Sequence, residues 1–283
     1  MSVRITKRIK KLVPLSARRY LRKGWAFSGR LNDLIVGRDR MIPWKQYALS
    51  IGGGDFEEVG RQYLQHFKEH GRLQPHEHVL DVGCGIGRMA VPLTGYLTTG
   101  RYTGFDAVEQ SIRWCNKRIA SRYPNFQFDH VDLYNEHYNP TGRLSALDFR
   151  FPYESASFDF VFLISVFTHM MPPEAEHYVA EIARVMKPGA RCLITSTLLN
   201  DESERLIEEG KSRLDYKYKL GAIRTVEKDE PETSVAHAEA WIREQYEKNG
   251  LTVDEPVRYG TWCGRDDGYA FQDFVIGIKK GAA

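Results

Sequence analysis

The sequence predicts an α/β fold in which a mostly parallel sheet of seven strands carries helices on both faces and the last strand is antiparallel. From residue 78 onward, short apolar runs alternate with segments of helical periodicity, as expected of strand–helix–strand units. The first of these runs breaks into a glycine-rich turn, "HVLDVGCGIGRMA". Only a loop containing "WCGRDDG" separates the last two runs. A short connection of this kind suits an antiparallel pair, because a parallel crossover needs a dozen or more residues.

Local patterns place the individual elements. Before the sheet, "IGGGDFEEVGRQYLQHFKEHG" predicts a helix that Asp55 caps and Gly71 ends. Helical periodicity continues in four later segments, residues 86–97, 108–122, 173–186 and 237–249. Strands are predicted over seven segments, residues 78–82, 102–106, 126–131, 158–164, 190–196, 253–260 and 270–278. Residues 200–236 are rich in charge and poor in periodicity, so we expect an insertion or lid there.

Composition indicates a folded protein of a reducing compartment. Of the 283 residues, 42% are hydrophobic and 27% are charged, which is typical of a globular chain. The four cysteines form no Cys-x-x-Cys pair, so neither a zinc site nor a disulfide framework is expected. The longest apolar run, "FVFLISVF", is too short to span a bilayer, and the N-terminus lacks the apolar stretch of a signal peptide. These features predict a cytoplasmic protein.

A basic N-terminal extension, residues 1–45, is predicted to precede the main domain at residues 46–283. Residues 1–40 hold twelve Lys and Arg against two Asp, whereas the rest of the chain holds 28 basic and 35 acidic residues. Residues 1–22 are amphipathic and could lie as a helix on an anionic membrane, which would make the protein peripheral to it. A lid over the active site is an equal alternative. Nucleic acid is an unlikely partner, because no nucleic-acid-binding module accompanies the charges.

The spacing of the glycines indicates which nucleotide the turn would bind. Dinucleotide-binding folds carry Gly-x-Gly-x-x-Gly, whereas Gly83, Gly85 and Gly87 run Gly-x-Gly-x-Gly. Arg88 stands where the third dinucleotide glycine would be. The acid before the turn, Asp81, would repel a pyrophosphate at the lip of the site. It suits a ligand that carries an ammonium group and a sulfonium.

Five ordered blocks carry a resemblance to a known family: "VLDVGCGIGR", "GFD", "SFDFVF", "VFTHM" and "RVMKPGARCLIT". Together they resemble the Rossmann-like class I S-adenosylmethionine-dependent methyltransferases. Within these, the chain is similar to the small-molecule branch related to the ubiquinone and sterol enzymes, also called type 11. The resemblance covers residues 50–200 and, more loosely, the closing strands. "RYGTWCGR" is also similar to a stretch in bacterial methyltransferases encoded with polysaccharide and glycolipid assembly enzymes.

The resemblance implies a set of residues that bind S-adenosyl-L-methionine. The glycines would lie against its methionine and ribose, Asp81 near its amino group, and Asp106 on the ribose hydroxyls. Ala107 would lie under the adenine, Asp132 and the Leu133 backbone would hold the ring, and Ser165 would lie near the methyl group. In the family, a short turn follows soon after the acid that contacts the adenine. Here some twenty residues separate Asp132 from Pro152. Asp148 is therefore an alternative to Asp132.

The absence of three motifs limits which classes of molecule could accept the methyl group. The region after the fourth strand has no Asn/Asp-Pro-Pro-Tyr/Phe motif and no nucleophilic cysteine, and residues 160–171 hold no acid. We therefore expect no bound metal and transfer to oxygen of a small molecule or glycan. His169 is the candidate base; a structural or cofactor-orienting role is the alternative.

Trp262 and Tyr269 could stack on the acceptor, and Arg265 could bind an anionic group. The alternative is that Trp262 covers the sheet edge and that Arg265 is solvated. The alternative functions are an NAD-dependent oxidoreductase and a non-catalytic interaction module.

Overall fold

The computed structural model describes residues 41–43, 53–135 and 138–281. The basic extension, with its predicted membrane contact through residues 1–22, lies outside the described residues. The chain divides into two units, residues 1–56 and 57–283, and the second unit contains both sheets. No helix in the described part of the chain combines the length and the apolar character needed to cross a membrane.

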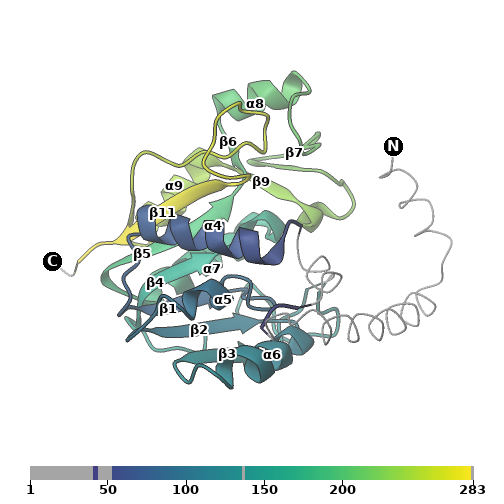
Figure 1. The fold of residues 1–283 in the computed structure, drawn as a ribbon. Coiled ribbons are helices and arrows are strands. Elements are labelled where there is room, and N and C mark those ends of the chain that lie inside the picture. Colours follow the sequence, from purple (N-terminus) through teal and green to yellow (C-terminus); the bar gives the residue numbers. More distant parts are fainter. Residues whose placement is uncertain (1–40, 44–52, 136–137, 282–283) are drawn as a thin grey trace. The chain divides into compact units, whose positions relative to one another are not determined.

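A central sheet of seven strands has the order β10-β11-β5-β4-β1-β2-β3 (Figure 1). Its strands are β1 (His78–Val82), β2 (Arg101–Asp106), β3 (Phe126–His130), β4 (Phe158–Leu163), β5 (Met186–Ser196), β10 (Leu251–Val253) and β11 (Asp273–Lys279). Neighbouring strands from β3 through β5 are parallel, and β11 is antiparallel to both β5 and β10. The predicted α/β fold is therefore confirmed. Because the parallel strands point the same way, their carboxyl ends meet at one edge, where such sheets bind ligands.

Helices follow most strands, as predicted, but several differ in extent. They are α4 (Phe56–Glu69), α5 (Ala90–Leu93), α6 (Glu109–Cys115), its continuation η1 (Asn116–Ala120), η2 (Phe167–His169), α7 (Pro172–Val185) and α9 (Glu239–Lys248). The helix expected over residues 86–97 is a single turn, since Gly87 has a positive φ and Pro92 supplies no N–H. The strand expected over 253–260 ends at Val253, and pairing resumes only at the bridge between Arg258 and Phe274.

Alternation along β4 separates the two faces of the sheet. Phe160 and Phe162 point to one face, where their rings lie 5.6 and 4.4 Å from that of Phe67 in α4. Val161 and Leu163 point to the other face and share a buried core with residues of α7 and α9. Such near-continuous burial is typical of a parallel strand covered on both sides.

The segment predicted as an insertion or lid contributes to a second sheet. Its strand order is β6-β9-β8-β7, and in Figure 1 it lies at the end of the central sheet away from β3. The elements are β6 (Leu198–Leu199), α8 (Asp201–Glu208), β7 (Tyr218–Leu220), β8 (Ile223–Thr225), η3 (Pro231–Thr233) and β9 (Val235–Ala238). Asn200 caps α8, its side-chain oxygen accepting from the Ser203 N–H at 3.0 Å. Strands of two to four residues are too short to show an alternation in the sequence.

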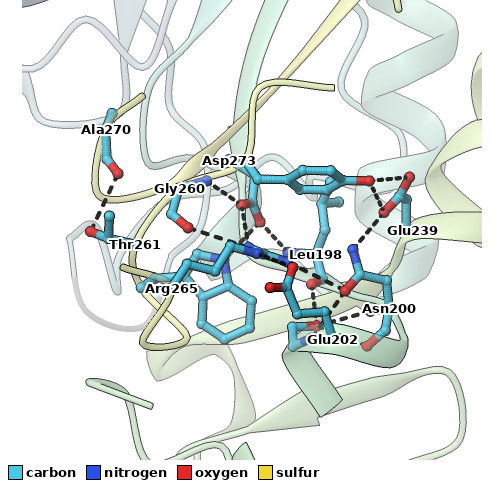
Figure 2. A network of polar contacts seen from close by, with 12 residues as sticks. Leu198, Asn200, Glu202, Glu239, Gly260, Thr261, Arg265, Ala270 and Asp273 are labelled. Atoms are coloured by element: carbon cyan, nitrogen blue, oxygen red, sulfur yellow. Dashed lines mark hydrogen bonds and ion pairs between the residues drawn. The ribbon is translucent and has the colours of Figure 1, made fainter. Parts of the chain in front are cut away.

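One buried carboxylate connects the second sheet to the first. Asp273, at the start of β11, is fully buried and accepts from the N–H groups of Leu198 and Gly260, each at 2.7 Å (Figure 2). The indole Nε1–H of Trp262 donates to the same carboxylate at 2.7 Å. Burial raises the pKa of Asp273 to about 6, although these donors and the Arg265 guanidinium favour its charged form. Each lost donor would therefore leave a buried acceptor less well satisfied.

Replacing Trp262 by Phe should lower the free energy of unfolding by about 1–3 kcal/mol, because a buried carboxylate loses a donor. Chemical denaturation followed by circular dichroism measures the change. Trp241→Phe is the matched control, since Trp241 is only half-buried and its indole N–H lies 3.2 Å from the neutral side-chain amide of Gln245. Equal losses in the two variants would contradict a special role for the Asp273 carboxylate.

Candidate functional site

The glycine turn after β1 has a backbone that other residues would strain. Gly83, Gly85 and Gly87 have φ angles of 79°, 52° and 76°. A Cβ atom on Gly83 would lie 2.7 Å from Cγ2 of Val166, and one on Gly87 would lie 2.6 Å from Cδ1 of Ile119. The turn therefore requires glycine both for its conformation and for space, and it leaves bare backbone at the carboxyl end of β1.

Asp106, the last residue of β2, is held against this turn. Its Oδ2 accepts from the Gly85 N–H and its Oδ1 from the Val108 N–H, both at 2.8 Å. Burial raises the pKa of Asp106, while these two N–H groups oppose the shift. Each carboxylate oxygen has capacity for a second donor. The pair of oxygens thus fits two adjacent hydroxyl groups, as a ribose presents.

The structure places Asp81 inside the protein rather than at the lip of the site. Its side chain is 2% exposed and accepts from the Tyr102 hydroxyl at 2.6 Å. Burial raises the pKa of Asp81 to about 8, and the nearby Asp106 charge adds to the rise. The absence of a side chain at Gly104 makes room for this pair, since a Cβ there would lie 2.8 Å from the Tyr102 hydroxyl oxygen. Burial therefore favours the protonated form of Asp81, and its contact with a cofactor amino group stays a prediction.

The predicted adenine side of the site is built on a segment that folds back on itself. The Asp132 carboxylate accepts from Nε of Arg143 at 2.6 Å, which lowers the pKa of Asp132. The backbone carbonyl of Asp132 accepts from the N–H groups of Arg143 and Leu144, each at 2.9 Å. Leu133 is buried, and Asp148 is exposed at the far end of the segment. Asp132 follows the end of β3 directly along the chain, and the choice of Asp132 over Asp148 stays a prediction.

Beside Asp106, the Ala107 carbonyl lies 3.2 Å from the His130 Nε2. Ala107 itself is half-buried and packs against the core. This leaves Ala107 at the edge of the sheet between the Asp106 carboxylate and the end of β3, which is where the sequence predicts the adenine.

A strained residue follows β4. Ser165 has a φ of 57°, unusual for a residue with a side chain. Its N–H donates to Oγ1 of Thr195 at 2.7 Å, and its hydroxyl donates to Oε1 of Gln272 at 3.0 Å. Gln272 was not predicted from the sequence. It reaches this edge because β11 runs antiparallel to β5, so that the start of β11 lies beside the end of β5.

The candidate base, His169, is in η2 and lies half-buried. Its Nδ1 is 3.0 Å from the Glu232 carbonyl oxygen, and its ring centroid is 6.4 Å from that of Tyr138. A neutral imidazole that donates through Nδ1 carries its lone pair on Nε2. Glu232 belongs to η3, in the segment predicted as an insertion or lid, so that segment does reach the candidate base.

The three predicted acceptor residues do not form one exposed surface, because Trp262 and Arg265 are buried around Asp273 and only Tyr269 is exposed. Trp262 is fully buried, and its ring is 5.3 Å from that of Tyr216. The Arg265 side chain is 4% exposed and is paired with Glu202 at 2.7 Å, so Arg265 is not solvated either (Figure 2). Tyr269 is exposed, and its ring contacts that of His70, the residue after α4. Trp262 and Arg265 thus offer no surface on which a sugar or aromatic ring could stack, because both satisfy the buried Asp273.

Comparison with known proteins finds methyltransferases that are similar to part of this chain. Residues 79–189 match the family described as "Methyltransferase domain". The O-methyltransferase cnsE of Penicillium expansum is 31% identical over 137 residues, which cover 46% of this chain and 42% of that protein. The phthiotriol/phenolphthiotriol dimycocerosates methyltransferase of Mycobacterium tuberculosis is 32% identical over 113 residues, covering 40% of this chain and 35% of that protein. The matches span less than half the length of these relatives.

A solved structure, the PH0226 protein from Pyrococcus horikoshii OT3, shares the fold with a TM-score of 0.55 at 18% identity, over 81% of this chain and 93% of that one. The sheet order, the glycine turn and the strand-end carboxylate place this chain among the Rossmann-like α/β folds. Residues 79–189 are therefore similar to a methyltransferase domain, and S-adenosyl-L-methionine is the cofactor that this similarity implies.

Replacing Asp81 by Asn should change how stability depends on pH. The folded pKa of about 8 exceeds the unfolded value of about 3.9, so the folded state keeps a proton that the unfolded state releases between these values. The wild type therefore loses stability as pH rises from 5 to 7, by up to about 1.4 kcal/mol per unit, whereas the neutral amide does not. Urea denaturation at pH 5, 6 and 7 measures both curves. Parallel curves would contradict the assignment, and the exposed Glu109→Gln variant is the control.

Proposed function

We propose that this protein transfers a methyl group from S-adenosyl-L-methionine to a hydroxyl oxygen of a small molecule, without a metal ion. The observation that carries the proposal is the Asp106 carboxylate bound to the Gly85 N–H of the glycine turn. This arrangement presents two acceptor oxygens and bare backbone side by side at the carboxyl edge of the sheet. The names of relatives such as the O-methyltransferase cnsE support oxygen as the site of transfer.

The residues of the site fit this cofactor. When bound, S-adenosylmethionine supplies a methyl group on a positively charged sulfur that makes the methyl electrophilic. Asp106 would accept from the ribose hydroxyls, and Gly83 and Gly85 would let the methionine portion lie against the backbone. Ser165 follows β4 next to Val166, which packs against Gly83, so the Ser165 hydroxyl and its partner Gln272 would lie on the side of the methyl group.

His169 is proposed to remove the proton of the acceptor hydroxyl. Oxygen attacks a methyl group far better as it loses its proton, and an imidazole is a suitable base near neutral pH. The Glu232 carbonyl supports this role, because it holds the hydrogen on Nδ1 and so leaves the basic lone pair on Nε2. Removal of the proton and attack on the methyl group would then occur at one edge of the sheet.

A glycan or glycolipid acceptor is the finer alternative suggested by "RYGTWCGR". The burial of Trp262 and Arg265 removes the two side chains of that stretch that would have recognised a sugar or an anionic group. A small molecule that bears a hydroxyl is therefore the better-supported acceptor. Two expectations from the sequence stay proposals: peripheral membrane contact through residues 1–22 and a cytoplasmic location.

Replacing Asp106 by Asn should weaken S-adenosylhomocysteine binding by about 10- to 100-fold, because hydrogen bonds to a charged acceptor contribute about 1.5–3 kcal/mol. Isothermal titration calorimetry measures the dissociation constant. Glu109→Gln makes the same carboxylate-to-amide change three residues away on an exposed helix position and should leave binding unchanged. Tighter binding of NAD than of S-adenosylhomocysteine by the wild type, or binding of neither, would favour the oxidoreductase or the non-catalytic module.

Replacing His169 by Ala should lower kcat for methyl transfer by about 100-fold or more, the usual contribution of a general base, while S-adenosylhomocysteine affinity stays within about twofold of the wild type. Transfer of labelled methyl to a panel of phenols and alcohols measures kcat. His177→Ala is the control, since His177 is also half-buried and also bonds a backbone carbonyl, that of Phe149. Equal kcat in both variants would assign His169 a structural role, and no transfer by the wild type would count against the proposed reaction.

A further inference from the structure

A buried histidine lies between the second sheet and the candidate base. His237, in β9, is fully buried, and β9 is paired at this residue with both β6 and β8. The His237 Nε2 lies 3.1 Å from the carbonyl oxygen of Met170, the residue that follows His169. Because a carbonyl oxygen only accepts, Nε2 carries the hydrogen and the imidazole donates to Met170. A side chain of the second sheet therefore holds the end of η2.

The surroundings of His237 keep its imidazole neutral. Burial lowers the pKa of His237 to about 4, although the bond to the Met170 carbonyl opposes this shift. The ring stacks on that of Trp241, with centroids 5.4 Å apart and an interplanar angle of 18°. A neutral imidazole has one N–H, so the bond from Nε2 to Met170 leaves a lone pair on Nδ1.

That lone pair indicates that packing alone does not explain His237. Among the residues that the structure describes, no donor meets the His237 Nδ1. A buried acceptor without a donor lowers stability, whereas an apolar side chain of similar size would bring no such atom. The Nε2–H donor to the Met170 carbonyl is what the imidazole supplies and an apolar side chain cannot.

The same stretch of chain also holds the ring of the candidate base. Glu232 precedes His237 in the chain and lies in η3, and its carbonyl oxygen is 3.0 Å from the His169 Nδ1. Residues 232–237 thus hold the side chain of His169 through one bond and the adjoining backbone through another. Resting on the proposed function, we propose that His237 is a positioning residue, whose bond to Met170 holds η2 so that the His169 Nε2 carries the basic lone pair.

The dimensions of η2 make it sensitive to this bond. It is a short turn of three residues, Phe167–His169, so a bond at its end can set the orientation of its side chains. A displacement of about 1 Å can lower the rate of a positioned reaction by about 100-fold. Loss of the bond to Met170 should therefore impair the base, whereas cofactor binding, which depends on Asp106, should persist.

Nuclear magnetic resonance of protein labelled with nitrogen-15 histidine tests this inference without an identified acceptor. Long-range proton–nitrogen spectra distinguish the two neutral tautomers of a ring, and the signals that disappear in His169→Ala and His237→Leu assign the two residues. At about pH 8, where an ordinary histidine is neutral, wild-type His237 should carry its hydrogen on Nε2 and His169 on Nδ1. His169 should become a mixture of tautomers in His237→Leu. His237→Gln, whose amide can still donate to Met170, should keep the wild-type pattern.

Methyl transfer to the best acceptor of the phenol and alcohol panel gives a second measurement. His237→Leu should lower kcat by about 10- to 100-fold and leave S-adenosylhomocysteine affinity within about twofold of the wild type. His237→Gln should restore most of kcat. His177→Leu is the control, because it removes a similar bond, from Nε2 to the Phe149 carbonyl at 2.9 Å, and should change neither kcat nor the His169 signals. His237→Asn, whose amide is shorter, replaces the leucine variant if that variant does not fold.

Several results would overturn the inference. One is a wild-type His237 that carries its hydrogen on Nδ1, and another is a His169 tautomer or a kcat that His237→Leu leaves unchanged. Equal losses in His177→Leu, or a His237→Gln variant as impaired as His237→Leu, would also contradict it, since the donor to Met170 would not be the cause. If the wild type transfers no methyl group to any acceptor, the proposed function fails, whereas the spectra still test whether His237 orients the His169 ring.

Discussion

The bond between the Asp106 carboxylate and the Gly85 N–H is the interaction on which the site depends. The turn after β1 has three glycines with positive φ. In this conformation the Gly85 N–H does not join a helix or a sheet, and it donates to the Asp106 carboxylate instead. Asp106, at the end of the neighbouring strand, satisfies one of them and also the Val108 N–H that opens α6. A single carboxylate thus fixes the turn, the end of β2 and the start of the next helix relative to one another. The same two oxygens are the acceptors that the proposed cofactor needs.

A second buried carboxylate, Asp273, has a comparable effect at the other end of the sheet. It holds the Leu198 and Gly260 backbones and the Trp262 indole, and so attaches the second sheet to the start of β11. Two strands of the second sheet, β8 and β9, flank η3, whose Glu232 carbonyl contacts His169. The position of the candidate base therefore rests in part on a carboxylate that would not touch the substrate. Both carboxylates have raised pKa values because each is buried, and both are stabilised by backbone donors.

How much of the site could be predicted depended on the distance along the chain between its parts. The glycines and Asp106 were identified because each follows directly from a strand with a clear pattern. Gln272 and Tyr138 were missed, since the first depends on antiparallel pairing of β11 with β5 and the second on the fold of a segment with no periodicity. Trp262 and Arg265 were predicted at an acceptor pocket because an aromatic and a cation in one loop suit both a binding surface and a buried ion-pair network. Only burial distinguishes these alternatives.

The sequence by itself determined the layered α/β fold, the glycine turn and the strand-end acid, because hydrophobic periodicity and glycine spacing are local properties of the chain. The tertiary structure decided which polar side chains are buried and which residues from distant segments meet. It placed Asp81 in the interior with Tyr102, Arg265 against Asp273, and Tyr138 beside His169. The physical reason is that burial and long-range contacts depend on how elements pack in space, and residues separated by tens of positions carry no local signal of that packing.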